Sequence, residues 1–121
     1  MKALIIDDDP DVRKIAHLCL RQFGGMEVIE ASSADEGLRR AAAEQPDVIL
    51  LDIMMPRVDG LAAIGSLRRQ PETADIPVIF LTARSGEDSE AVVRKTGARG
   101  LLSKPFDPTT LATKVRSLLR G

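Results

Sequence analysis

Three uninterrupted apolar runs most constrain the fold of this chain. They span residues 3–6, 48–51 and 78–81, and none of them alternates apolar with polar residues. Continuous apolar strands are typical of the centre of a parallel sheet that is covered on both faces. Two shorter apolar pairs, Val28-Ile29 and Leu101-Leu102, predict outer strands of the same sheet.

Segments with helical periodicity separate these runs. Asp9-Pro10 predicts a helix start, because aspartate caps helices and proline fits the first turn, and Gly24-Gly25 predicts its end. Ser33 and Glu36 have the spacing of a capping box at the start of the next helix. A third helix is expected around Ile64, a weaker fourth at Ala91-Val92, and Asp107-Pro108 opens a fifth. The apolar face of the first helix is expected to comprise Val12, Ile15, Ala16, Cys19, Leu20 and Phe23.

The alternation of strands and helices predicts an α/β fold. Right-handed crossovers between five strand-helix pairs give a doubly wound (βα)5 arrangement around a five-stranded parallel sheet. The best prediction for the strand order is 2-1-3-4-5, the flavodoxin-like order. A length of 121 residues fits one compact domain, so we expect residues 1–121 to form a single domain.

Polar side chains that can bind a ligand or react with one follow the predicted strands. Asp7, Asp8 and Asp52 supply carboxylates, Thr82 a hydroxyl and Lys104 an amine. Ligands of open α/β sheets bind at the carboxyl ends of the strands, and these groups are the parts of a metal-assisted phosphate site. Each signal alone has an ordinary explanation, because acidic turns are common and threonine suits strands.

Taken together, Asp7-Asp8, Asp52, Met55-Pro56, Thr82-Ala83 and Lys104-Pro105 resemble the receiver domain of two-component response regulators over essentially the whole chain. The resemblance implies that Asp52 is the phosphoacceptor. It also implies a Mg²⁺ ion bound by the carboxylates of Asp8 and Asp52 and by the backbone carbonyl of Met54, with Asp7 held nearby through water.

The resemblance assigns further roles at the same site. Thr82, Ala83 and Lys104 bind the phosphoryl group and take part in switching, and the bond before Pro105 is cis. The chain departs from the family at Leu101, where many receivers carry a tyrosine or phenylalanine that turns inward on activation. The usual coupling between phosphorylation and the partner-binding face is therefore in doubt.

The implied partners are proteins. A formal net charge of −1 and a pI near 5.8 argue against direct binding to nucleic acid, and no apolar run is long enough to span a membrane. The resemblance implies a histidine kinase or phosphotransfer protein as donor. It implies a downstream protein as target, or an output domain if the chain is a fragment, and a homodimer through the fourth helix, fifth strand and fifth helix. With Cys19 as the single cysteine, a reducing cytoplasmic location is the simpler expectation.

Two other functions remain open. The first is a Mg²⁺-dependent aspartyl-phosphate phosphatase of the haloacid-dehalogenase type, which usually needs a second acid two residues after the nucleophile, where this chain has Met54. The second is a receiver-shaped scaffold that is never phosphorylated, which is disfavoured because no member of the site is missing. We expect a signalling domain, not an enzyme, that takes part in its own phosphoryl transfer and dephosphorylation. His17 falls off the apolar face of its helix and is expected to be exposed and inert, because no second histidine or other partner in the sequence suggests a relay.

Overall fold

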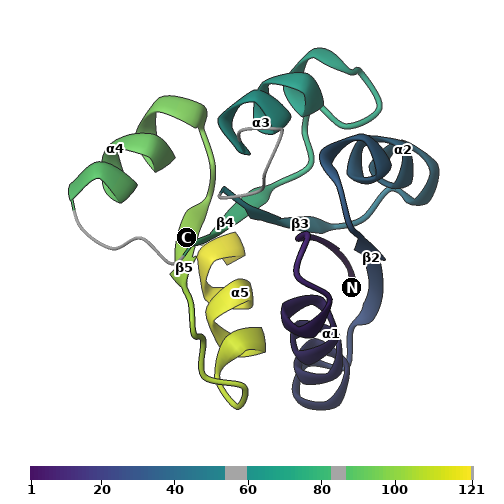
Figure 1. Ribbon diagram of the computed structural model, residues 1–121, viewed down its shortest axis with the longest axis vertical. Helices are drawn as coiled ribbons and strands as arrows, with labels where there is room; N and C mark the ends of the chain where they lie inside the picture. Colours follow the sequence, from purple (N-terminus) through teal and green to yellow (C-terminus); the bar gives the residue numbers. More distant parts are fainter. Residues whose placement is uncertain (54–59, 83–86, 121) are drawn as a thin grey trace.

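Five strands and five helices alternate along the chain (Figure 1). The computed structural model describes residues 1–53, 60–82 and 87–120. The strands are β1 (Lys2–Ile6), β2 (Glu27–Ala31), β3 (Val48–Asp52), β4 (Val78–Thr82) and β5 (Gly100–Ser103). The helices are α1 (Pro10–Gly24), α2 (Ala34–Glu44), α3 (Gly60–Arg69), α4 (Glu87–Thr96) and α5 (Leu111–Arg120).

The strands form one parallel sheet in the order β2-β1-β3-β4-β5. This confirms the doubly wound α/β fold and the 2-1-3-4-5 order predicted from the sequence. Helices α1 and α5 cover one face of the sheet, and α2, α3 and α4 cover the other (Figure 1). Because a helix connects each strand to the next, every strand points the same way and the polar residues at the strand ends share one edge.

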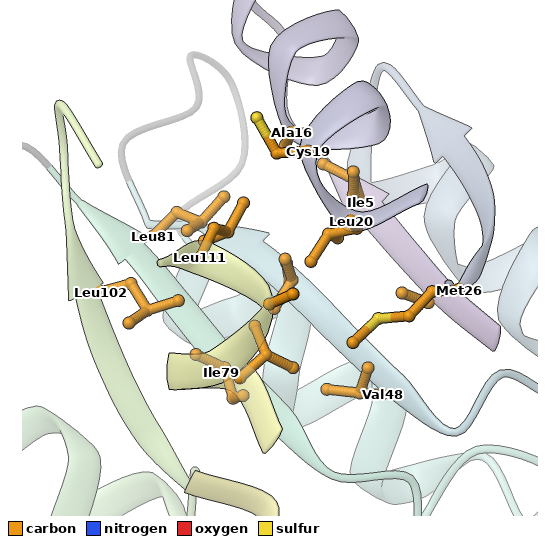
Figure 2. Packing of buried hydrophobic residues seen from close by; sticks show 14 residues of the cluster. Ile5, Ala16, Cys19, Leu20, Met26, Val48, Ile79, Leu81, Leu102 and Leu111 are labelled. Atoms are coloured by element: carbon orange, nitrogen blue, oxygen red, sulfur yellow. The ribbon is translucent and has the colours of Figure 1, made fainter. Parts of the chain in front are cut away.

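Successive side chains of the central strands enter two separate apolar cores. On the α1 and α5 side, Ile5 and Val48 pack with Leu20 and Leu111 (Figure 2). On the other side, Leu4, Ile6, Ile49 and Leu51 belong to a second core that includes Phe80 and Leu67. Every residue of β3 and β4 is buried, which explains why these strands read as continuous apolar runs.

The predicted ends of α1 are confirmed. The carboxylate of Asp9 accepts a hydrogen bond from the Asp11 N–H at 2.9 Å, and Pro10 occupies the first turn. Gly25 ends the helix with a φ of 63°, a left-handed conformation that glycine adopts without a steric cost.

The predicted apolar face of α1 is only partly correct. Ala16, Cys19 and Leu20 are buried, but Ile15 is 47% exposed and Phe23 is 56% exposed. Periodicity identifies one side of a helix, but it does not show how much of that side the sheet and the neighbouring helix cover. Ile15 and Phe23 lie beyond the covered part.

Two other predicted helix starts differ in detail. Ser33 caps α2, but the Glu36 side chain accepts from the N–H of Ser32 at 2.6 Å, one residue before the expected donor. Helix α5 begins at Leu111, three residues later than Pro108. The Asp107 carboxylate accepts from the Thr109 N–H and hydroxyl, so the predicted cap closes a turn that precedes the helix. Within the described parts of the chain, no helix is long and apolar enough to cross a membrane.

Candidate functional site

The carboxyl ends of four strands bring the predicted polar residues together. Asp7 directly follows β1, Asp52 is the last residue of β3, and Lys104 directly follows β5. Thr82 is the last residue of β4 and is fully buried. Residues that are far apart in sequence thus meet at one edge of the sheet, close to where the strand order reverses.

Lys104 is the central cation of this cluster. Its Nζ lies 2.6 Å from Oδ2 of Asp7 and 3.3 Å from Oδ2 of Asp52. Both aspartates are buried, and the Lys104 side chain is only 18% exposed. Burial acts to lower the pKa of Lys104, but the hydrogen bond and charge of Asp7, together with Asp52, outweigh it and raise the pKa above 10.5. Lys104 therefore carries a full positive charge at neutral pH.

The carboxylate and the backbone N–H and carbonyl of Asp7 all have hydrogen-bond partners. Its Oδ1 accepts from the Asp9 N–H at 2.9 Å, while its Oδ2 contacts Lys104. Its backbone N–H donates to the Ala31 carbonyl at 3.1 Å, and its own carbonyl accepts from Arg13 Nη1 at 2.7 Å. This set of partners satisfies a carboxylate that would otherwise be costly to bury.

Thr82 and Lys104 are also joined through the backbone. The N–H of Lys104 donates to the Thr82 carbonyl at 2.8 Å, which extends the pairing of β4 with β5 by one residue. The Lys104–Pro105 bond is cis, the isomer that the resemblance implied. The hydroxyl of Thr82 and the amine of Lys104 thus belong to adjacent strand ends.

The three aspartates form a group that can hold a cation. Asp7, Asp8 and Asp52 each offer a carboxylate oxygen, and these oxygens lie within 4.8 Å of one another. Mg²⁺ prefers oxygen ligands at about 2.0–2.1 Å and usually keeps several waters, so two ligands on opposite sides are about 4.2 Å apart. Three carboxylate oxygens at this spacing are a donor set of the kind that Mg²⁺ prefers. Asp8 is exposed and leaves room for water ligands.

Not every predicted residue can be placed. Met54 and Ala83 lie outside the described residues. Leu101 is partly buried and packs against the core on the α2, α3 and α4 side of the sheet. It also lines an open groove of about 410 Å³ between β5 and α5, together with Phe106 and Leu118.

A group of three interacting polar side chains beside this cluster, Arg13, Glu30 and His17, was not predicted from the sequence. Arg13 Nε lies 3.3 Å from Oε1 of Glu30, and His17 Nδ1 lies 2.8 Å from Oε2 of the same carboxylate. No partner for His17 was evident from the sequence, and the structure places the Glu30 carboxylate beside it. Arg13 and His17 are four residues apart and share one face of α1, which was the available signal. Their partner on β2 is known only once that strand is placed beside the helix.

Comparison with known proteins identifies relatives over nearly the whole chain. The family model of the response regulator receiver domain matches residues 3–116. The DNA-binding dual master transcriptional regulator RpaA of Synechocystis sp. is 40% identical over 119 residues, which are 98% of this chain and 49% of RpaA. Protein PilH of Pseudomonas aeruginosa is 35% identical and is covered over 98% of its length. The chain thus spans about half of RpaA and nearly all of PilH.

Solved structures agree with these matches. The chemotaxis protein CheY4 of Vibrio cholerae superposes with a TM-score of 0.89 at 30% identity, covering 97% of both chains. A response regulator structure from Chloroflexus aurantiacus gives a TM-score of 0.87 at 32% identity over 99% of this chain. With the sheet order, the strand-end cluster and the family match in agreement, this chain belongs to the response regulator receiver domain family.

Proposed function

We propose that residues 1–121 form a single receiver domain that accepts a phosphoryl group on Asp52 in a Mg²⁺-dependent reaction. The observation that carries the proposal is the position of the buried Asp52 carboxylate. It lies 3.3 Å from Lys104 and within the same oxygen cluster as Asp7 and Asp8. A nucleophile, an amine and a cation-binding group therefore occupy one corner of the sheet.

Each residue has a proposed part in phosphoryl transfer. A carboxylate oxygen of Asp52 forms a bond to phosphorus as the bond from phosphorus to the donor breaks, and the donor leaves with that electron pair. Lys104 neutralises phosphoryl oxygens from the β5 side. A bound Mg²⁺ would offset the negative charge of the phosphoryl group. Charge neutralisation of this kind is the main need of phosphoryl transfer.

The proposed ligands of Mg²⁺ are Asp8, Asp52 and the backbone carbonyl of Met54, with Asp7 acting through water. The hydrogen bonds of Asp7 support its indirect role, because Asp9 and Lys104 already engage its two carboxylate oxygens. Thr82 and Ala83 are proposed to contact the phosphoryl group, since Thr82 ends the strand next to Asp52.

The proposed donor is a histidine kinase or a phosphotransfer protein, and the cytoplasm is the proposed location. Receiver domains are signalling domains, and the phosphorylated form is proposed to bind a downstream protein or to act on an output domain. Relatives such as RpaA are about twice as long as this chain, whereas PilH is of similar length, so both arrangements occur among relatives. The face formed by α4, β5 and α5 is the proposed partner and homodimer surface.

Comparing the reactions of the protein with acetyl phosphate and with a phosphate ester distinguishes a receiver domain from a phosphatase. Acetyl phosphate has a good leaving group, and we expect it to phosphorylate the protein when Mg²⁺ is present. Alkyl phosphate esters such as glycerol 3-phosphate should not be hydrolysed, because their leaving alcohol needs a proton and the position two residues after Asp52 is Met54, which supplies no acid. Sustained release of inorganic phosphate from such an ester, lost in Asp52→Asn, would contradict the receiver assignment and favour the phosphatase.

A further inference from the structure

Arg13 connects three elements beside the aspartate cluster. It lies on α1, its Nη1 donates to the Asp7 carbonyl at 2.7 Å, and its Nε lies 3.3 Å from the Glu30 carboxylate on β2. The Arg13 side chain is 17% exposed, so its hydrogen bonds are shielded from much of the solvent. A guanidinium presents several donors in a fixed plane and can hold both acceptors at once.

The bond to Asp7 acts on Asp8 through the peptide plane. The carbonyl of Asp7 and the N–H of Asp8 belong to the same rigid peptide unit, so fixing the oxygen also fixes the direction in which the chain leaves β1. Asp8 is exposed, and its carboxylate position therefore depends strongly on the backbone that carries it. The segment is also bonded on either side of this peptide, since the Asp7 N–H donates to the Ala31 carbonyl and the Asp9 N–H donates to the Asp7 carboxylate, and Arg13 is the side chain that bonds the Asp7 carbonyl itself.

Glu30 in turn orients Arg13. One carboxylate oxygen of Glu30 faces Arg13, and the other lies 2.8 Å from His17 Nδ1. Since Arg13 and His17 are both on α1, each oxygen of the Glu30 carboxylate contacts a side chain of the same helix. This arrangement limits the rotation of Glu30 and hence that of the guanidinium.

We propose that Arg13, oriented by Glu30, is a positioning residue for the Mg²⁺ site and sets the Asp7–Asp8 peptide so that the Asp8 carboxylate faces Asp52. This inference rests on the proposed function, because it assumes that the aspartate cluster binds Mg²⁺. Among the described residues, the side chain of Arg13 bonds the Asp7 backbone carbonyl and Glu30, and not the carboxylates of Asp7, Asp8 or Asp52.

Positioning and simple charge predict opposite effects of removing Arg13. If only charge mattered, the loss of a positive group near the site would strengthen Mg²⁺ binding, and the additional loss of the Glu30 charge would restore the original affinity. If Arg13 positions Asp8, its loss weakens Mg²⁺ binding, and removing Glu30 as well does not repair it.

The test is a Mg²⁺ titration of the full chain. Binding is monitored through amide chemical shifts, because the chain has no tryptophan or tyrosine to serve as a fluorescent reporter. The variants are Arg13→Met, Arg13→Lys, Glu30→Gln, and the double variant R13M/E30Q. Arg68→Met is the matched control, since Arg68 also donates to backbone carbonyls, those of Ala74 and Ile76, but lies at the other end of the sheet. Asp8→Ala tests the metal site itself.

Outer residues that orient metal ligands typically change affinity by about 10–100-fold, and we expect a loss of roughly tenfold for Arg13→Met. The double variant should be as weak as Arg13→Met, Arg13→Lys should recover part of the affinity, and Arg68→Met should match the wild type. If Arg13→Met does not fold, Glu30→Gln is expected to show a smaller loss in the same direction.

Unchanged or tighter Mg²⁺ binding by Arg13→Met, or wild-type affinity in the double variant, would overturn the positioning role alone. A wild-type protein that does not bind Mg²⁺, or an Asp8→Ala variant that binds it normally, would instead overturn the proposed metal site and the inference that rests on it.

Discussion

Lys104 compensates the negative charge of two buried aspartates. Its Nζ contacts Asp7 and Asp52, and these contacts outweigh the effect of burial on its pKa. Among the described residues, this amine is a positive group that contacts both carboxylates. Replacing Lys104 should therefore destabilise the metal-free protein, because one partner of a buried ion pair would be lost.

The effect of Lys104 on stability should depend on pH. A group whose pKa is raised by folding stabilises the protein fully below its unfolded pKa and loses this contribution as pH rises through the folded pKa. With EDTA present, wild type should melt at a higher temperature than Lys104→Met by a constant margin between about pH 7 and pH 10, where the aspartates are ionised, and the margin should shrink as the pH rises further. The comparison cancels the titration of the other lysines. A margin that stays constant or grows as the pH rises above about 10 would contradict the assignment.

At the residue scale, the sequence revealed groups adjacent to strongly patterned segments. Asp52 follows four apolar residues and Asp9 precedes a proline, so each could be assigned from its neighbours. The contact between Arg13 and Glu30 could not be assigned in this way, because α1 has several charged residues and β2 has two. Pairing between them depends on the exact rotation of the helix over the sheet, which a local pattern does not determine.

At the scale of elements, helix α2 approaches β1 very closely at Gly37. A methyl group added there would lie 2.8 Å from Cγ1 of Ile6, inside the normal contact distance. Ile6 is buried and β-branched, so its side chain has little freedom to move away. Ile6 also precedes Asp7, which links this packing to the candidate site.

Gly37→Ala should consequently destabilise the protein by about 1–3 kcal/mol through overpacking. Gly65→Ala is the control, because among the described residues the atom closest to a methyl group added there is Nη1 of Arg69, at an ordinary contact distance of 3.6 Å. Alanine in a helix is favoured over glycine by about 0.8–1.0 kcal/mol, so the control should be neutral or stabilising. Urea unfolding of both variants measures the difference, and equal stabilities would show that α2 can move away from β1.

Strand β5 carries the departure from the usual family pattern. Leu101 packs beside β4, where its register partner is Phe80, and it has no hydroxyl with which to bond a loop carbonyl. Leucine can adjust to a small movement of Thr82 by changing rotamer. We expect beryllofluoride to produce amide shift changes concentrated around Asp52 and Thr82, with modest changes over α5.

Leu101→Tyr provides the matched comparison for this prediction. An aromatic ring at position 101 has two separate places to occupy, inward or outward, and should extend the shift changes across β5 and α5. Large changes over α5 in the wild type, equal to those in Leu101→Tyr, would show that leucine transmits the signal as well as a ring does.

Element boundaries were less predictable than element types. Helix α5 starts at Leu111 because Asp107 and Thr109 form a turn first, and a proline after an aspartate is compatible with both arrangements. The exposure of Phe23 depends on where α5 and the sheet stop covering α1. Helix ends and the exposure of single residues depend on packing between elements, so the periodicity within one element does not predict them.

At the scale of the whole molecule, topology assembles the site. The strand order places β1 and β3 side by side in the sheet and β5 at its edge, and Lys104 reaches back from that edge to Asp7. This arrangement was predictable because continuous apolar strands demand cover on both faces and crossovers are right-handed. The grouping of acids and amine then follows from the common direction of the strands.

The central claim is that Asp52 accepts the phosphoryl group, and locating the modification tests it most directly. The protein is treated with acetyl phosphate and Mg²⁺, reduced with borohydride to convert an aspartyl phosphate to homoserine, digested and analysed by mass spectrometry. We predict the conversion at Asp52, its loss in Asp52→Asn and its loss when EDTA removes the metal. Conversion at another aspartate in the wild type, or full phosphorylation of Asp52→Asn, would contradict the account.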